Sequence, residues 1–326
     1  MKYSIITPVY NRADCVARCL DSVIRNLQWG VELEHIVVDD GSHDETPKIV
    51  QNYADKHPHI KFIPFSQNRG TNAARNAAIA AATGEYCIIL DSDDYFVDEA
   101  INFINSIASN QKYMHYCFAA DDMVEYYQSC SLLMGKQKAE LTFENFLFEE
   151  VTGDFVHCIK TETLQKYPFD EDLRIYEGVF FKRFYREAQK ILYTNRIVTI
   201  RERNRTDSVT RNVLRNDRKQ IAKGLLSKQL LVEWYGEELS QKPKGVSILR
   251  NAYKVMLDCN LLIGNYKDAM VCKQKLVSIG GKVPTHLRFV YTFNLGGLYF
   301  YAGCIYVYVR YYLLRSNICL LYTSPS

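Results

Sequence analysis

The sequence lacks the cysteine and histidine spacings that are typical of metal-binding or disulfide-bonded frameworks. Its ten cysteines include no C-x-x-C pair and form no Cys/His cluster at zinc spacing. Such spacings are the usual sequence signature of structural zinc and of dithiol redox sites. Cys87 and Cys117 lie inside apolar runs, and we interpret them as small buried hydrophobic residues. We therefore expect neither a disulfide framework nor a zinc site.

Two phosphate-binding fingerprints and a secretion signal are also missing. No G-x-G-x-x-G follows the first apolar segment, and no G-x-x-x-x-G-K-[ST] occurs anywhere in the chain. The first absence counts against a dinucleotide-binding fold, and the second counts against a P-loop. The apolar run at residues 5–9 is too short for the core of a signal peptide. We expect the catalytic part to be cytoplasmic.

Charge is divided unevenly along the 326 residues. Residues 216–326 contain 15 Lys and Arg against six Asp and Glu, whereas residues 1–215 contain 25 against 31. The length allows two domains, and we place their boundary between residues 215 and 216. A basic second part would be attracted to an anionic membrane or to nucleic acid. Nucleic acid is disfavoured, because the basic residues are dispersed among expected helices.

The first part alternates strand-like runs with helix-like segments. Strands are predicted at residues 3–10, 33–38, 60–65 and 86–90, with helices after Asn11, after Ser42 and over 71–83. This alternation predicts a parallel sheet with right-handed crossovers. Ligands bind such sheets beyond the carboxyl ends of the strands. Three of these ends carry polar or acidic groups, and we expect one site there: Pro8–Tyr10, Asp39–Asp40 and Asp91–Asp94.

Three carboxylates lie within four residues at the end of the last of these strands, on Asp91, Asp93 and Asp94. Asp is depleted in strands and like charges repel, so the cluster needs a stabilising partner. Mg²⁺ is the simplest candidate, because it prefers carboxylate oxygens and commonly keeps a bound phosphate as a further ligand. The alternative is a solvated acidic turn in which Asp94 caps the following helix.

Four motifs in this order resemble the family 2 glycosyltransferases, including those of bacterial polysaccharide biosynthesis. They are Ser4–Asn11 (SIITPVYN), Val38–Ser42 (VDDGS), Asn68–Asn76 (NRGTNAARN) and Gly84–Asp94 (GEYCIILDSDD). The resemblance covers roughly the first 210 residues. It implies a GT-A fold, that is, an α/β, Rossmann-like and mostly parallel sheet flanked by helices. Residues 216–326 would be a helical extension.

The resemblance implies a nucleotide-sugar donor at the strand ends. Pro8 and Tyr10 would frame the nucleoside, and Asp40 would accept a hydrogen bond from the imide N–H of uracil, which disfavours cytosine. The alternative for Asp40 and its neighbour is helix capping with an Asx turn. Arg69 or Arg75 would lie near the diphosphate, because arginine binds phosphate through paired N–H groups. A solvated helix face or a structural ion pair is the alternative for Arg75.

The acidic turn would complete this donor site. Asp93 would bind Mg²⁺ or Mn²⁺ directly, while Asp91 would contact the ribose or reach the metal through water, with Ser92 between them. The metal would act as a Lewis acid that neutralises the nucleoside diphosphate as it leaves.

Inverting transfer also needs a base that takes the proton of the acceptor hydroxyl. Relatives usually supply the Asp of a Glu-Asp pair, followed six residues later by Arg. Here Glu177 lies six residues before Arg183, and Tyr176 replaces the preceding Glu. We predict that Glu177 is the base, although its side chain is one methylene longer than that of Asp. The alternative is an ordinary acid at a helix N-terminus in a non-catalytic protein that binds sugar nucleotides or acts as a membrane scaffold.

The second part is predicted to be helical and to meet a membrane. Residues 289–309 contain no charged residue, and their length can span a bilayer. Their five tyrosines favour the headgroup level instead, so we expect an interfacial helix at the inner face of the cell membrane. Packing on the catalytic domain is the alternative. Residues 319–326 resemble translated sequencing-adapter read-through and are not expected to be native.

These observations predict an inverting glycosyltransferase that moves a sugar from a nucleotide donor, UDP-linked in our interpretation, to a hydroxyl of a glycan or lipid-linked glycan. A nucleotidyltransferase would need a glycine-rich, lysine-bearing loop after the first strand. Pro8–Arg12 is not such a loop.

Overall fold

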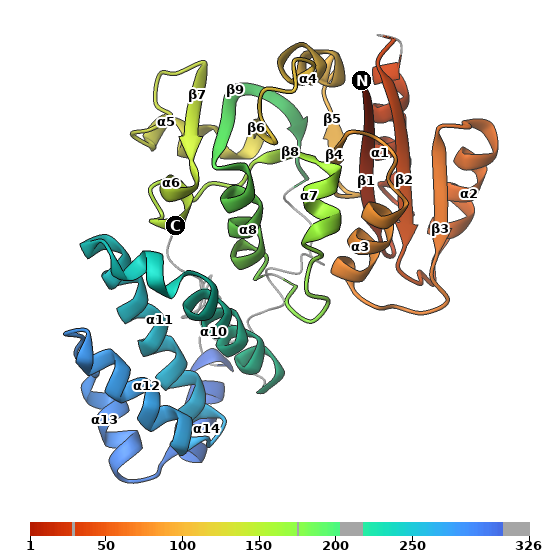
Figure 1. Ribbon diagram of the computed structural model, residues 1–326. Coiled ribbons are helices and arrows are strands. Elements are labelled where there is room, and N and C mark those ends of the chain that lie inside the picture. The colour runs from red at the N-terminus through yellow and green to blue at the C-terminus, as the bar shows by residue number, and fades with distance from the viewer. Residues whose placement is uncertain (28–29, 175, 203–217, 309–326) are drawn as a thin grey trace. The chain divides into compact units, whose positions relative to one another are not determined.

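The computed structural model describes residues 1–27, 30–174, 176–202 and 218–308. The chain divides into two compact units, Met1–Asn204 and Arg205–Ser326, which are described separately. Figure 1 shows the elements of both. The predicted domain boundary at residues 215–216 lies outside the described residues.

The first unit is a mixed sheet flanked by helices. The sheet has nine strands among the described residues. Eight of them run in the order β3-β2-β1-β4-β8-β6-β9-β5, and the ninth, β7, pairs with β9. The strands are β1 (Lys2–Val9), β2 (Glu32–Asp39), β3 (Ile60–Pro64), β4 (Tyr86–Ile89), β5 (Tyr95–Phe96), β6 (His115–Ala120), β7 (Lys138–Thr142), β8 (Val156–Lys160) and β9 (Lys190–Ile200). The helices are α1 (Val16–Asn26), α2 (Thr46–Lys56), α3 (Thr71–Ala81), α4 (Ala100–Ala108), α5 (Val124–Ser129), α6 (Phe143–Leu147), α7 (Thr161–Lys166) and α8 (Gly178–Ala188). Figure 1 places α3, α7 and α8 in succession along one face of the sheet.

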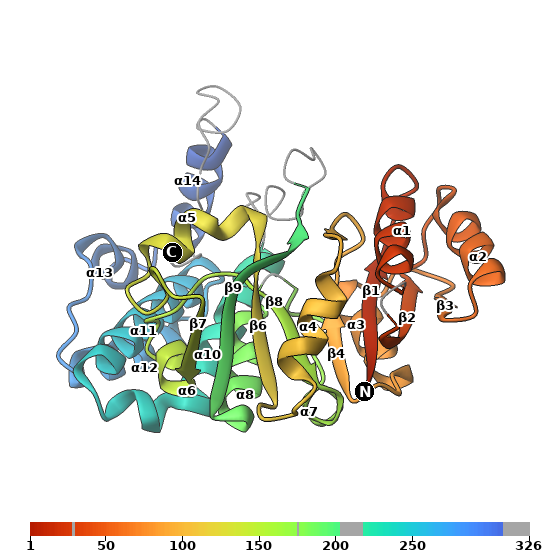
Figure 2. The same ribbon diagram turned by 90° about the horizontal axis from the view of Figure 1, so that it is seen from above.

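The predicted parallel order holds for the first half of the sheet only. β1 is parallel to both β2 and β4, and β2 is parallel to β3. β8 then runs antiparallel to β4 and to β6, and β9 is parallel to β6 but antiparallel to β5 and β7. Figure 2 shows this succession of strands from above. The α/β class is confirmed. Parallel pairing is less extensive than predicted, because the prediction rested on the strands up to residue 90, and every antiparallel pair includes a strand that lies after that residue.

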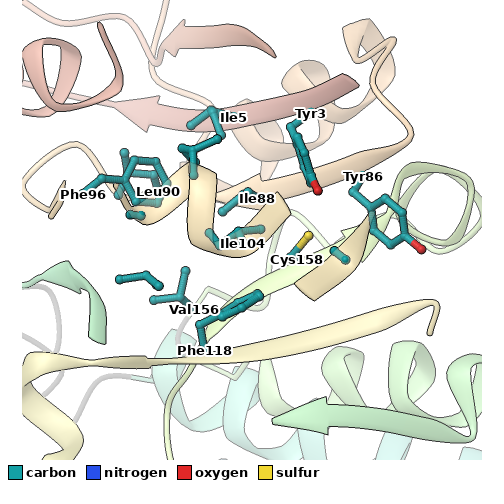
Figure 3. Close-up of a cluster of buried hydrophobic side chains, with 14 of the residues drawn as sticks. Tyr3, Ile5, Tyr86, Ile88, Leu90, Phe96, Ile104, Phe118, Val156 and Cys158 are labelled. Atoms are coloured by element: carbon teal, nitrogen blue, oxygen red, sulfur yellow. The ribbon is translucent and has the colours of Figure 1, made fainter. Parts of the chain in front are cut away.

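The central strands are buried on both faces. Every residue of β1 after Lys2 is buried, which explains its continuous apolar and β-branched sequence. On one face Ile5 and Ile88 join Ile104 of α4 and Phe118 of β6 in a single apolar cluster (Figure 3). This core fixes the positions at which β1, β2 and β4 end.

The helix after β1 begins later than predicted. α1 begins at Val16 with Cys15 as its N-cap, so Asn11 does not cap it. Asn11 instead adopts a left-handed conformation (φ 49°), which asparagine tolerates better than most residues. Its side-chain oxygen accepts a hydrogen bond from the backbone N–H of His43 at 2.9 Å. Asn11 therefore ties the end of β1 to the turn that follows β2.

The second unit consists of helices, as predicted, and has its own apolar core. Its described helices are α10 (Arg218–Ser240), α11 (Pro243–Leu262), α12 (Tyr266–Ser278), α13 (Thr285–Thr292) and α14 (Gly296–Tyr308). Ile221, Leu257, Leu261 and Leu276 belong to the buried cluster that joins α10, α11 and α12. Since this cluster draws on residues from Ile221 to Val290, the helices form one packed body.

The prediction of one continuous helix at residues 289–309 is wrong, because the chain forms two helices there. α13 ends at Thr292, and Asn294 turns the chain with a φ of 55° before α14 begins. The backbone N–H of Leu295 donates to the carbonyl of Val290 at 2.9 Å, which closes the end of α13. None of the helices in the described ranges has the length and apolar character needed to traverse a bilayer.

Candidate active site

The carboxyl ends of three neighbouring strands bring the predicted site residues to one edge of the sheet. β2, β1 and β4 are adjacent, and Val9 at the end of β1 pairs with Asp39 at the end of β2. Tyr10, Asp40 and the acidic turn follow these strands directly. The three strand ends therefore lie side by side, as the alternation of strands and helices in the sequence predicts.

Asp40 anchors the loop that leads into α3. One carboxylate oxygen accepts hydrogen bonds from the backbone N–H groups of Arg69 at 2.7 Å and Gly70 at 3.1 Å, and the other accepts from Gly70 at 2.9 Å. Gly70 has a φ of 97°, which a residue with a side chain rarely adopts. Burial raises the pKa of Asp40, and the backbone hydrogen bonds oppose that rise. Because each carboxylate oxygen accepts about two hydrogen bonds, the described residues leave one acceptor position on Oδ2 unused.

The Asx-turn alternative applies to Asp39 and not to Asp40. The Asp39 carboxylate accepts hydrogen bonds from the hydroxyl of Ser42 and, at 3.1 Å, from its backbone N–H. The two adjacent acids therefore have different structural partners, and Asp39 shapes the turn after β2.

Arg75 on α3 joins acids from two distant parts of the chain. Its Nη2 lies 3.0 Å from Oδ1 of Asp91, and its Nη1 lies 3.5 Å from Oε1 of Glu177. Only 14% of the Arg75 side chain is exposed, which excludes the solvated helix face. Burial opposes ionisation of Arg75, but the charges of Asp91 and Glu177 prevail and raise its pKa. Burial likewise acts to raise the pKa of Asp91, and the charge of Arg75 prevails and lowers it.

We expect Arg75→Ala to lower the free energy of unfolding by about 3 kcal/mol, because two carboxylates would lose their shared cation. Urea unfolding measures this change. The matched control is Arg69→Ala, since Arg69 is about half exposed and pairs with Glu171 at 3.5 Å. A surface pair of that kind contributes about 0–1 kcal/mol. Equal losses in the two variants would contradict the role given to Arg75.

Glu177 lies at the N-terminal end of α8 with its carboxylate turned to Arg75. It occupies the N-cap position, yet its side chain makes no capping hydrogen bond. Its side chain is 19% exposed. Arg183, six residues later on the same helix, donates to the carbonyl of Pro168 at 2.8 Å and so fastens α8 to the preceding segment. Glu177 is therefore an acid at a helix N-terminus, as in the alternative, but its side chain faces Arg75 and does not cap α8.

The acidic turn after β4 contains one carboxyl with a strongly shifted pKa. Burial together with the charges of Asp91 and Asp93 raises the pKa of Asp94 to about 8, and Arg201 opposes the rise. Oδ2 of Asp93 lies 4.0 Å from Nε of Arg12. The alternative in which Asp94 caps the following helix does not hold, because α4 begins at Ala100 with Glu99 as its N-cap. Carboxylate oxygens with this mutual repulsion fit a hard divalent cation, which would relieve it.

The raised pKa of Asp94 predicts a pH-dependent stability. The folded chain keeps a proton at pH 4–8 that the unfolded chain loses near pH 4, so stability falls as pH rises through this range. Without divalent cations we expect a contribution of up to about 1.4 kcal/mol per pH unit. Urea unfolding at pH 5 and pH 8 in a chelator should show a smaller difference for Asp94→Asn than for the unmodified chain. Identical pH slopes would contradict the assignment, and Asp98→Asn, whose side chain is exposed, is the control.

The other predicted site residues differ in accessibility. Pro8 is buried in β1 opposite Val38, and Ser92 is buried with its carbonyl accepting from the thiol of Cys15. Tyr10 is 37% exposed. Pro8 and Ser92 therefore shape the site from beneath, while Tyr10 and Arg69 are open to a ligand.

Arg201 is a site residue whose partners sequence reasoning missed. At the end of β9, its guanidinium lies 2.8 Å from Asp154, 3.4 Å from Asp122 and 3.8 Å from Asp94. These acids are far apart in sequence, so no local pattern indicates that they share one cation. Residues 203–217, which follow Arg201 and Glu202 in the chain, lie outside the described residues.

The comparison with known proteins decides the family. Residues 4–124, which carry the three strand ends and the acidic turn, match the family described as Glycosyl transferase family 2. The part of the chain that contains these residues belongs to this family. It is a glycosyltransferase, as predicted from its motifs.

Relatives of known name resemble this glycosyltransferase over different lengths. A GalNAc(5)-diNAcBac-PP-undecaprenol beta-1,3-glucosyltransferase of Campylobacter jejuni is 28% identical over 289 residues, 87% of this chain and 90% of that protein. A poly(ribitol-phosphate) beta-glucosyltransferase of Bacillus spizizenii is 41% identical over 102 residues, 31% of this chain. The match spans only 16% of the Bacillus protein.

Solved structures share the fold of this glycosyltransferase. TarS residues 1–349 of S. aureus, crystallised with UDP-GlcNAc, has a TM-score of 0.56 at 19% identity, covering 86% of this chain and 89% of that one. The mannosyltransferase PcManGT of Pyrobaculum calidifontis, in complex with GDP-Man and Mn²⁺, has a TM-score of 0.52 at 18% identity, covering 96% and 88%. At these identities the likeness concerns the fold, and it confirms the predicted GT-A architecture.

Proposed function

We propose that this glycosyltransferase moves a sugar from a UDP-linked donor to a hydroxyl of a lipid-linked glycan, with inversion at the sugar carbon and with a divalent cation. The observation that carries the proposal is the bridge made by Arg75, with nitrogens 3.0 Å from Asp91 and 3.5 Å from Glu177. One buried guanidinium thereby sets the proposed base at a fixed position relative to the acidic turn. Transfer requires this juxtaposition, because the hydroxyl that the base deprotonates attacks the same anomeric carbon from which the nucleoside diphosphate departs.

The donor would lie across the ends of β1, β2 and β4. Tyr10 is accessible beside the nucleoside position, and the remaining acceptor position on Oδ2 of Asp40 suits the imide N–H of uracil. Arg69 is half exposed on the loop that Asp40 anchors, where it would reach the diphosphate. Support for UDP comes from the TarS structures with UDP and UDP-GlcNAc, and the GDP-Man complex of PcManGT makes GDP the competing nucleotide.

Asp93, with Asp91 directly or through water, would hold Mg²⁺ or Mn²⁺. Such ions are bound in nucleotide sites by one or two carboxylates and the phosphates of the substrate. When bound, the ion supplies Lewis-acid charge that stabilises the departing diphosphate. Burial and the charges of Asp91 and Asp93 raise the pKa of Asp94, and this supports the proposal because a bound cation would relieve the repulsion among these carboxylates.

Glu177 would act as the base in a single displacement. Its carboxylate takes the proton of the acceptor hydroxyl while the hydroxyl oxygen bonds to the anomeric carbon. The bond from that carbon to the phosphate oxygen breaks, and the nucleoside diphosphate leaves with the electron pair. Arg75 orients Glu177 for this transfer, and the 19% exposure of Glu177 leaves the carboxylate reachable by an acceptor.

A membrane-linked acceptor fits the second unit. Phe289, Phe293, Leu298 and Tyr301 are each more than half exposed, in a segment that begins beside the exposed Arg288. Exposed aromatic side chains with nearby basic residues favour the interface of an anionic membrane. The Campylobacter relative is named for an undecaprenol-linked glycan, which agrees with peripheral association at the inner face of the cell membrane.

Calorimetric titration of the full chain with UDP and with GDP, each with Mn²⁺ and with chelator, tests the donor site. We expect UDP to bind with Mn²⁺, and binding to fall at least tenfold in chelator. A preference for GDP would overturn the uracil contact of Asp40, and no binding of either nucleotide would overturn the donor site. Turnover is then measured as UDP release from UDP-sugars in the presence of an undecaprenyl-diphosphate-linked glycan. UDP binding without turnover on any acceptor would favour a non-catalytic binding protein.

A further inference from the structure

A second group of metal-ligand side chains lies away from the acidic turn, within the β6–β8 pair. His115 and Cys117 are two residues apart on β6, so their side chains point to the same face of the sheet. Cys117 is directly opposite His157 of the antiparallel strand β8. Side chains at opposed positions of such a pair are close neighbours. The register of β6 with β8 thus brings two imidazoles and one thiol together, although their spacing in the sequence is not that of a typical zinc site.

The distances among the three groups match those around a tetrahedral zinc ion. Nε2 of His115 is 3.0 Å from Nδ1 of His157, and Sγ of Cys117 is 3.7 Å and 3.6 Å from these two nitrogens. In a tetrahedral zinc site the Zn–N bonds are about 2.0–2.1 Å long and the Zn–S bonds about 2.3 Å. Two nitrogen ligands are then about 3.3 Å apart, and a nitrogen and a sulfur ligand are about 3.6 Å apart. The three ligand atoms therefore surround a point at bonding distance from each of them.

Burial gives this group the chemistry of a ligand set. His115 and Cys117 have no exposed surface, and His157 is 8% exposed. Neutral imidazole is the form that coordinates metal. A thiol beside two neutral imidazoles is a borderline-to-soft donor set, which selects zinc over Mg²⁺ or Mn²⁺.

We propose that His115, Cys117 and His157 bind one Zn²⁺ ion, separate from the divalent cation of the donor site. Within the described ranges no fourth His, Cys, Asp or Glu joins the group, so these residues supply three ligands. On binding, the thiol of Cys117 loses its proton to solvent and its sulfur coordinates the ion as thiolate. No redox change is involved.

The ion would support the helix that carries the proposed base. The ring of His157 lies 4.4 Å from that of Phe181, and the ring of His115 is stacked on Tyr185 at 5.0 Å between centroids. Both aromatic residues belong to α8, which begins next to Glu177. A metal that locks His115 and His157 in place would therefore stabilise the surface on which α8 packs. A hydrogen bond shared by the two rings without any ion is the competing account.

Titration of the full chain, prepared metal-free with chelator, with Co²⁺ and then Zn²⁺ tests the proposal. Co²⁺ bound by a thiolate gives a near-ultraviolet charge-transfer band that oxygen ligands do not give. We expect this band to saturate at one equivalent of Co²⁺, to vanish on addition of one equivalent of Zn²⁺, and to be accompanied by a higher melting temperature. Absence of the band in the unmodified chain would overturn the proposal without any variant.

Matched variants locate the site. Cys117→Ala should lose the band, whereas Cys158→Ala, a buried cysteine next to His157 on the same strand, should keep it. Asp93→Ala should also keep the band, since it removes a carboxylate of the donor site only. The cobalt band therefore does not depend on the proposed function. The glycosyltransferase proposal could be overturned while the zinc site is confirmed. Persistence of the band in Cys117→Ala would show that a different thiol binds the metal and would overturn the assignment.

Discussion

Replacing Asp93 with alanine is expected to abolish Mn²⁺-dependent UDP binding and to lower kcat/KM by about 10³-fold. The variant removes the carboxylate that would hold the cation against the leaving diphosphate, a contribution of several kcal/mol. Calorimetry with UDP in Mn²⁺ measures the binding loss, and UDP release in the presence of acceptor measures the kinetic loss. Residual binding should be independent of metal and no tighter than that of the unmodified chain in chelator.

Asp98→Ala is the matched control for this variant. Asp98 lies five residues further along the chain, and its side chain is 76% exposed beside Arg25 at 3.5 Å. An exposed pair of this kind contributes little, so we expect a change of less than about twofold. If Asp93→Ala kept Mn²⁺-dependent UDP binding, the cation would be held by other residues, and the acidic turn would be a structural feature of the sheet edge.

The position of the proposed donor-site residues at neighbouring strand ends could be predicted, because it depends on local sequence. Buried parallel strands are recognisable as continuous apolar runs, and polar residues directly after such runs must lie at their carboxyl ends. Tyr10, Asp40 and Asp91 follow β1, β2 and β4 in this way. The burial of Ser92 was not predictable, since it depends on a contact with Cys15, which is distant in sequence.

The contacts of Arg75 and Arg201 could not be predicted, because they join residues from separate segments. Glu177 is 102 positions from Arg75, and Arg201 reaches acids near residues 94, 122 and 154. No periodicity records such pairings. The second half of the sheet, where strand direction changes from pair to pair, is unpredictable for the same reason.

The zinc-like group shows a further limit of spacing arguments. Absence of C-x-x-C excludes metal sites whose ligands are close in sequence, but Cys117 and His157 are 40 positions apart and meet only through strand register. Residues 289–309 show the converse limit, because counting charges predicted one helix where Asn294 divides two. Turn-forming residues within an apolar run are a stronger signal than the run itself.

Replacing Glu177 with glutamine is expected to lower kcat by about 10²–10⁴-fold, because the amide cannot take the proton of the acceptor hydroxyl. Glutamine keeps the size of the side chain and an oxygen that can accept from Arg75. UDP binding by calorimetry should therefore stay within about threefold of the unmodified chain. UDP release with acceptor measures the kinetic change, and a selective effect on kcat separates a base from a residue that only holds the fold.

Two further variants sharpen the test of Glu177. Glu171→Gln is the matched control, since Glu171 is 46% exposed and pairs with Arg69 at 3.5 Å, and it should keep kcat within about twofold. Glu177→Asp retains a carboxylate that is one methylene shorter, so we expect about a tenfold loss with transfer still measurable. If Glu177→Gln turned over at the rate of the unmodified chain, the ion pair of Glu177 with Arg75 would be structural, and another carboxylate would have to take the proton.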